Sequence, residues 1–159
     1  MENGREDAPS GFLFGTAEND EKTLSDLVTL EKECFSEPWS ENSFAFALRH
    51  PELFCLPVVY DGERLAGYAV LFCLFETGEL QNIAVREEYR GRGLGEKLLG
   101  RCLDEARRKG AEKVLLEVRK SNAPAIALYQ KAGFSAAGER KNYYRLPTED
   151  ALIMAKELK

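Results

Sequence analysis

The sequence of 159 residues has a single histidine, His50, and no two cysteines in a C-x-x-C pair. Structural zinc sites combine closely spaced cysteines and histidines, so the sequence predicts no metal site. The four cysteines stand far apart among apolar neighbours, at Cys34, Cys55, Cys73 and Cys102. This placement favours reduced, buried thiols over disulfides.

Long apolar runs are also absent. None approaches the roughly 20 residues that cross a bilayer, and residues 1–10 carry Glu2, Glu6 and Asp7 without the apolar segment of a secretory signal. We therefore expect a cytoplasmic protein without membrane association. The length and a hydrophobic share of 44% suit one globular domain, which we place at 16–159, behind an N-terminal tail at 1–15.

The net charge of −5 is unevenly distributed. Residues 1–40 contain ten acidic and three basic residues, so the rest of the chain is slightly positive. Two interpretations remain open: an acidic tail with a solvated helix face, or an N-terminal part that faces a cationic substrate. Direct nucleic-acid binding, which requires a basic surface, is not expected.

Apolar periodicity and turn residues predict one alternation of helices and strands, without internal repeats. Helices are expected at 23–35, at 40–49 with Ser40 as N-cap, at 93–109, and after a cap at Ser121 or Asn122. Strands are expected at 53–60, 65–75, 79–85, 113–119, 134–144 and 151–157. The first three read as successive antiparallel strands with short turns.

A glycine-rich turn, Arg90-Gly91-Arg92-Gly93-Leu94-Gly95, joins the strand ending at Val85 to an amphipathic helix. Its backbone N–H groups and the helix N-terminus favour an anion, so the turn predicts phosphate binding. The spacing excludes a dinucleotide loop, because Glu96 stands where G-x-G-x-x-G needs glycine, and no Walker Gly-Lys-Ser/Thr occurs. Alternatively, the glycines only ease a tight connection.

Arg90-x-x-Gly93-x-Gly95 resembles the pyrophosphate signature R/Q-x-x-G-x-G/A of the GNAT acetyltransferases, a resemblance that extends over residues 23–158. It implies acetyl-CoA as co-substrate and an α/β (α+β) fold, with a mixed, mostly antiparallel sheet of six to seven strands flanked by about four helices. The residues implied to contact the cofactor are Ile83, Ala84, Val85, Arg90, Gly91, Arg92, Gly93, Leu94, Gly95, Glu96 and Asn122.

A second group of residues lies downstream. Glu117 interrupts the apolar strand 113–119, where a carboxylate is costly to bury without partners. Exposure at a sheet edge or pairing with an arginine would explain it as well as catalysis does. Tyr129 would by itself be read as packing on its helix, and Arg119 either orients Glu117 or caps the strand end.

Longer motifs resemble one GNAT branch, the RimI branch, whose bacterial enzymes acetylate the N-terminal α-amino group of a small-subunit ribosomal protein of the S18 type. The resemblance implies Glu117 as general base, Tyr129 as general acid and direct transfer in a ternary complex. The motifs are Phe35-Ser36-x-Pro38-Trp39-Ser40, Asn82-Ile83-Ala84-Val85, Arg92-Gly93-Leu94-Gly95, Leu116-Glu117-Val118-Arg119-x-Ser121-Asn122, Ala125-Ile126-Ala127-Leu128-Tyr129 and Asn142-Tyr143-Tyr144.

The same resemblance implies that Trp39, Tyr143 and Tyr144 border the acceptor site. The alternatives are a hydrophobic lid for Trp39 and strand packing for the two tyrosines. The implied partner is the basic N-terminal peptide of a ribosomal protein, bound by a monomer or weak dimer. A lysine side chain or a small amine is the alternative acceptor. A non-catalytic acyl-CoA-binding module is disfavoured, because such a module needs neither Glu117 nor Tyr129.

Overall fold

The computed structural model describes residues 11–159, which form eight strands, four α-helices and one 3₁₀ turn. The strands are β1 (Phe12–Thr16), β2 (Phe54–Cys55), β3 (Pro57–Asp61), β4 (Arg64–Leu74), β5 (Thr77–Val85), β6 (Lys113–Arg119), β7 (Ser135–Tyr144) and β8 (Glu149–Glu157). The helical elements are α2 (Glu21–Cys34), α3 (Glu41–Arg49), η1 (Glu87–Tyr89), α4 (Leu94–Arg108) and α5 (Ala123–Lys131).

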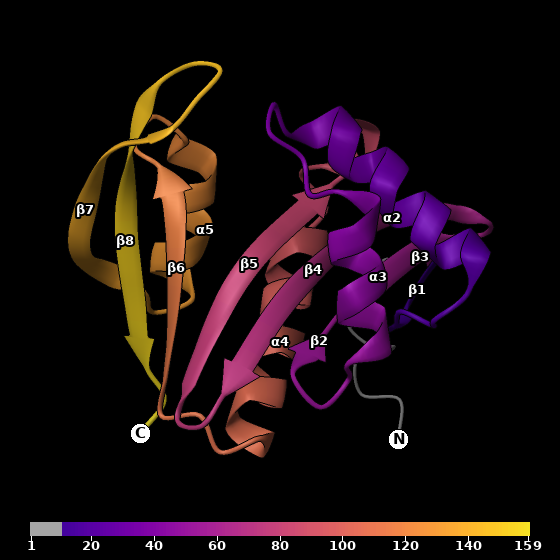
Figure 1. Ribbon diagram of the computed structural model, residues 1–159, viewed down its shortest axis with the longest axis horizontal. Helices are drawn as coiled ribbons and strands as arrows, with labels where there is room; N and C mark the ends of the chain where they lie inside the picture. Colours follow the sequence, from indigo (N-terminus) through magenta and orange to yellow (C-terminus); the bar gives the residue numbers. More distant parts are fainter. Residues whose placement is uncertain (1–10) are drawn as a thin grey trace.

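All strands belong to one sheet, in the order β1-β3-β4-β5-β6-β8-β7, with β2 beside β4 (Figure 1). Every pairing is antiparallel except that of β5 with β6. The mixed, mostly antiparallel sheet with four flanking α-helices is confirmed. It has eight strands instead of six to seven.

Two features of the sheet account for the additional strands. β2 and β3 divide the single strand expected at 53–60, with a break at Leu56, and β1 begins inside the stretch 1–15 that we expected to be a tail and ends at Thr16. β1 pairs with β3 from Phe12 opposite Asp61 to Thr16 opposite Pro57. Because that pairing is long-range, the local sequence pattern does not predict it. Residues 1–10 of the expected tail lie outside the described residues.

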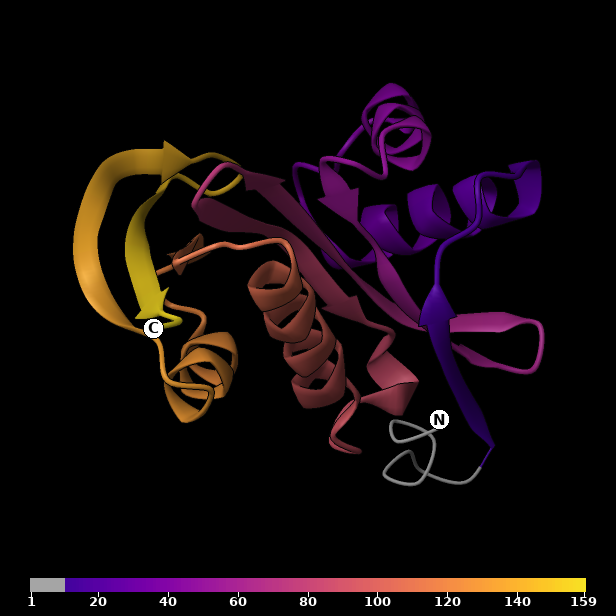
Figure 2. The same cartoon turned by 90° about the horizontal axis from the view of Figure 1, so that it is seen from below.

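Helices cover both faces of the sheet (Figure 2). Helices α2 and α3 bury Leu27, Leu30 and Phe44 against one face. On the other face α4 and α5 pack, and α4 buries an apolar stripe at helical spacing, which includes Leu94 and Leu98. No helix within residues 11–159 is long and apolar enough to cross a membrane.

Side chains cap three of the helices at their N-termini. The Asp20 carboxylate accepts from the backbone N–H of Thr23 at 2.8 Å and begins α2, and Ser40 caps α3, as predicted. Of the two candidates before α5, Asn122 is the cap. Helix α4 differs, because Gly93 at its N-cap has no side chain to offer.

The parallel pair β5 and β6 separates halfway along its length. Pairing runs from Thr77 opposite Lys113 to Leu80 opposite Leu116 and stops there. Beyond that point β5 stays with β4 and β6 stays with β8, so their carboxyl-terminal halves diverge (Figure 1). Helices α4 and α5 begin just after these two ends, and the candidate site lies at this separation.

Candidate active site

The glycine turn leaves backbone donors free at the start of α4. Gly91 and Gly93 both have φ of +80°, in the left-handed region that disfavours other residues. A Cβ built on either glycine meets no atom within 4 Å, so this side of the turn is open. Since no side chain caps α4, its first N–H groups are available to an anion. The turn therefore fits a diphosphate group.

The charged side chains of this segment have partners elsewhere. Arg90 donates its Nε–H to the carbonyl of Val85 at 2.8 Å. The Arg92 guanidinium lies over two aromatic rings, 5.9 and 5.7 Å from their centroids. Glu96 pairs with Lys131 at 3.3 Å, which turns its carboxylate toward α5. Glu96 can thus bind an anion only through its backbone N–H.

The other expected cofactor residues flank the separation of β5 and β6. Ile83 and Val85 direct their side chains into the α4 side of the core, while Ala84 faces the α2 side. Because β6 no longer pairs with this part of β5, backbone groups on that edge are left for a ligand. Across the gap, Asn122 uses its Oδ1 to accept from Ala125 N–H, which leaves its Nδ2 group to donate.

Glu117 lies on β6 with its side chain 28% exposed. Its Oε2 accepts a hydrogen bond from Nε of Arg140 on β7, so the arginine pairing considered from sequence is present. A hydrogen bond with Glu117 also raises the pKa of Tyr143. The carboxylate thus sits between a cation and a phenol, both from β7.

Tyr129 on α5 is only 5% exposed and packs edge-on against Phe134, with ring centroids 5.9 Å apart. Burial raises its pKa, and the nearby Tyr144 hydroxyl adds to the effect. Tyr144 has a pKa raised to about 12, by burial first and then by the charge of Glu117. Tyr144 therefore lies within electrostatic reach of both proposed catalytic groups.

Arg119 holds two loops together instead of orienting Glu117. It donates to the carbonyl of Arg145 at 2.7 Å and to Ser36 Oγ at 3.4 Å. Glu37, beside Ser36, accepts from the backbone N–H of Arg145 at 2.9 Å. The loop between α2 and α3 and the β7–β8 connection are thus joined next to the end of β6.

A buried carboxylate that the sequence reasoning missed supports the Trp39 loop. Glu31 on α2 is 1% exposed and accepts from the Trp39 backbone N–H at 2.8 Å. It also accepts from Tyr68 Oη and from Asn82 Nδ2. The available signal was position, because Glu31 stands four residues after Leu27 on the apolar face of its helix.

Trp39 comes from the loop between α2 and α3, and Tyr143 and Tyr144 come from the end of β7. The Trp39 ring packs on Phe44 with centroids 5.2 Å apart and also lines a pocket. Tyr143 is 49% exposed, and its ring meets that of Tyr144 edge-on at 5.0 Å. The glycine turn before α4 and these aromatic residues therefore belong to different elements around the gap between β5 and β6.

The cysteines offer no activated nucleophile. Burial raises the pKa of all four thiols, that of Cys55 to about 11, whereas a nucleophilic cysteine needs a lowered pKa. Among residues 11–159, no three His, Cys, Asp or Glu side chains cluster as a metal site would require. The arrangement suits transfer between two bound substrates, with Glu117 and Tyr129 able to exchange protons.

Comparison with known proteins agrees with this chemistry. The model of the Acetyltransferase (GNAT) family matches residues 23–134. The [ribosomal protein bS18]-alanine N-acetyltransferase of Escherichia coli strain K12 is 39% identical over 145 residues, which are 84% of this chain and 95% of that protein. Its Salmonella typhimurium counterpart is 41% identical over 130 residues, 79% of this chain and 85% of that protein.

Solved structures show the same fold. The crystal structure of the ribosomal-protein-S18-alanine N-acetyltransferase from Escherichia coli has a TM-score of 0.83 and 33% identity, covering 93% of this chain and 94% of that one. A GNAT family acetyltransferase from Elizabethkingia anophelis with acetyl-CoA bound has a TM-score of 0.74 at 24% identity, covering 94% and 100%. The chain belongs to the GNAT acetyltransferases and is an acyltransferase that takes acetyl-CoA as co-substrate.

Proposed function

We propose that this protein transfers the acetyl group of acetyl-CoA to the N-terminal α-amino group of a small-subunit ribosomal protein of the S18 type. The observation that carries the proposal is the similarity to relatives named for that reaction, over about four fifths of the chain. An acceptor of this kind would place the enzyme in the cytoplasm.

Glu117 acts as the general base in this proposal. Attack on a thioester needs a neutral amine, and an α-amino group with a pKa of about 7.7–8.0 is roughly one tenth neutral near pH 7. A lysine amine, with a pKa near 10.4, is less than about one thousandth neutral at that pH. A carboxylate that accepts a proton directly or through water is therefore sufficient for an N-terminus. The incoming amine competes with Arg140 for Glu117.

Tyr129 acts as the proton donor to the leaving sulfur. Acetyl-CoA supplies a thioester whose thiolate leaves when the amide bond forms. Because its pKa is raised, the Tyr129 hydroxyl stays protonated at neutral pH and can donate a hydrogen bond as negative charge develops on the sulfur. The high thiol pKa values favour direct transfer over a cysteine acyl-enzyme.

The test compares two synthetic peptides that carry the basic N-terminal sequence of a small-subunit ribosomal protein. One has a free α-amino group and the other is blocked there. We expect mass spectrometry to find one acetyl group, at the N-terminus, on the free peptide and none on the blocked one.

Equal acetylation of the blocked peptide would contradict the proposal and identify lysine as the acceptor. Comparison of protein N-termini in cells with and without the gene would then name the natural acceptor. Loss of acetylation at a single ribosomal N-terminus is the expected result.

A further inference from the structure

Four side chains form a row on the face of the sheet that carries Glu117. Phe54 of β2 stands opposite Phe72 of β4, Phe72 opposite Glu79 of β5, and Glu79 opposite Leu115 of β6. Residues paired in this way share a face of the sheet. Glu117 follows Leu115 by two positions and so points to the same side. The row thus leads away from Glu117 across three further strands.

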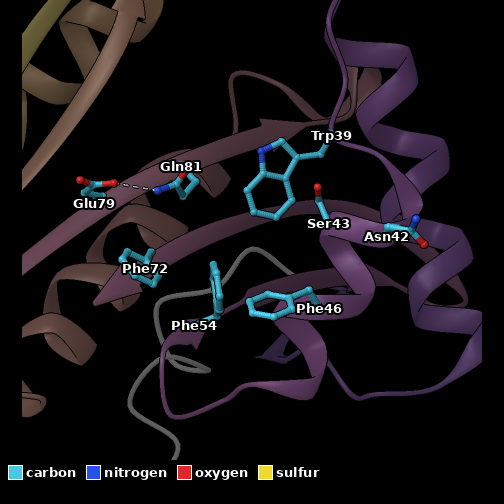
Figure 3. Close-up of a pocket in the computed structure, with 8 residues that line it drawn as sticks. All are labelled: Trp39, Asn42, Ser43, Phe46, Phe54, Phe72, Glu79 and Gln81. Atoms are coloured by element: carbon cyan, nitrogen blue, oxygen red, sulfur yellow. Dashed lines mark hydrogen bonds between the residues drawn. The ribbon is translucent and has the colours of Figure 1, made fainter. Parts of the chain in front are cut away.

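An aromatic pocket of about 530 Å³ lies over the far part of this row. Figure 3 shows Phe46 of α3 facing Phe54 and Phe72, with Trp39 above them and Glu79 and Gln81 along the β5 side. The ring centroids of Phe46 and Phe54 are 6.0 Å apart, and those of Phe54 and Phe72 are 5.1 Å apart. Phe46 remains 45% exposed although three aromatic neighbours surround the space beside it. A large apolar side chain would bury this surface.

Glu79 gives the rim of the pocket a negative charge. Its side chain is exposed and forms no ion pair with any residue in 11–159; its hydrogen bond comes from Gln81 Nε2, at 3.0 Å. Glu79 stands opposite Leu115 of β6, two positions before Glu117. The pocket and the candidate catalytic carboxylate therefore share one face of the sheet, which carries carboxylates at both Glu79 and Glu117.

We propose that this pocket binds the acceptor polypeptide beyond its N-terminus, with an apolar side chain among the four aromatic residues and a neighbouring cationic side chain at Glu79. The inference rests on the proposed function. Neighbouring strands are about 4.8 Å apart, so Glu117 and the pocket are roughly 10–15 Å apart. An extended chain covers that span in about three to four residues, which assigns the pocket to an acceptor residue between positions three and five.

The experiment uses a reference decapeptide with serine at positions three, four and five and lysine at the other downstream positions. Three further peptides carry phenylalanine at one of these positions in turn. We expect one of them to exceed the reference in kcat/KM by about tenfold, through a lower KM. Phe46→Ala and Phe72→Ala should each reduce this ratio to about twofold or less, and Glu79→Lys should raise KM for all lysine-containing peptides.

Phe75→Ala is the matched control, because Phe75 is an 83% exposed phenylalanine that does not line the pocket. It should preserve the tenfold preference. Equal rates on all four peptides with the unaltered enzyme, or a preference that survives in both pocket variants, would overturn the inference while the proposed function stands. Failure to acetylate even the serine reference would overturn the proposed function, and this inference with it.

Discussion

The carboxylate of Glu31 accepts hydrogen bonds from Asn82 Nδ2 through both of its oxygens, at 2.8 and 2.7 Å. This contact ties α2 to the part of β5 that has left β6. The same carboxylate accepts from the backbone N–H of Trp39 at 2.8 Å. One buried acidic group therefore positions both the β5 edge and the loop that carries Trp39.

Replacing Glu31 by alanine should destabilise the protein by about 3 kcal/mol or more. The change leaves three donors without their acceptor, those of Trp39, Tyr68 and Asn82, and each buried unsatisfied donor costs about 1–3 kcal/mol. Urea unfolding measures the loss. Glu33→Ala, on the same helix but half exposed in an ion pair with Arg86, should cost about 1 kcal/mol or less; a similar cost for both variants would refute the role of Glu31.

Glu117→Gln should lower kcat by about 10²–10⁴-fold, the usual contribution of a positioned acid or base. Tyr129→Phe should also lower kcat, because it removes the hydroxyl while keeping the buried ring. Acetyl-CoA affinity, measured by calorimetry, should change little in either variant, since neither side chain belongs to the glycine turn. Unchanged kcat in both variants would rule out the assigned roles.

Two glycines of the turn should respond differently to alanine. Gly93 has φ of +80°, so Gly93→Ala should cost about 1–2 kcal/mol and weaken acetyl-CoA binding by about tenfold, because the first N–H groups of α4 shift. At Gly95 an added Cβ meets Leu128 at 3.7 Å and Val85 at 3.8 Å, which are ordinary contacts. Gly95→Ala should therefore keep acetyl-CoA affinity and slightly raise stability. Thermal unfolding and calorimetry on the pair test this, and equal losses would count against the geometry of the turn.

The value of kcat/KM should rise with pH as the acceptor amine loses its proton around pH 8. It should then remain level to pH 10. Tyr129 has a pKa raised above the usual value of about 10 by burial, so its protonated, active form persists through this range. Tyr144, with a pKa of about 12, also does not titrate in this pH range. A fall in rate near pH 9 that disappears in Tyr129→Phe would contradict the raised pKa.

Local features of the chain could be predicted because they depend on residues close in sequence. Ser40 caps α3 and Asn122 caps α5, each through a hydrogen bond to a residue three positions on. The alternation of Lys113–Arg119 predicts β6 with the bounds it has. The same locality explains why the glycine turn before α4 points to an anion.

Other features required the folded chain. Arg140 reaches Glu117 from a strand 23 residues away, and the register of β7 is irregular between Arg140 and Tyr144, so no spacing rule connects them. Sequence reasoning therefore offered an arginine pairing only as one possibility and did not name the residue.

Local sequence was enough to indicate the glycine turn proposed for the donor, because the turn is contiguous and its backbone geometry follows from its glycines. The surface proposed for the acceptor depends instead on tertiary contacts. Glu31 and Asn82 are 51 residues apart, and the row from Phe54 to Leu115 combines four strands whose register depends on the packing of the whole sheet. Contacts of this kind are fixed by long-range pairing, which a local pattern does not encode.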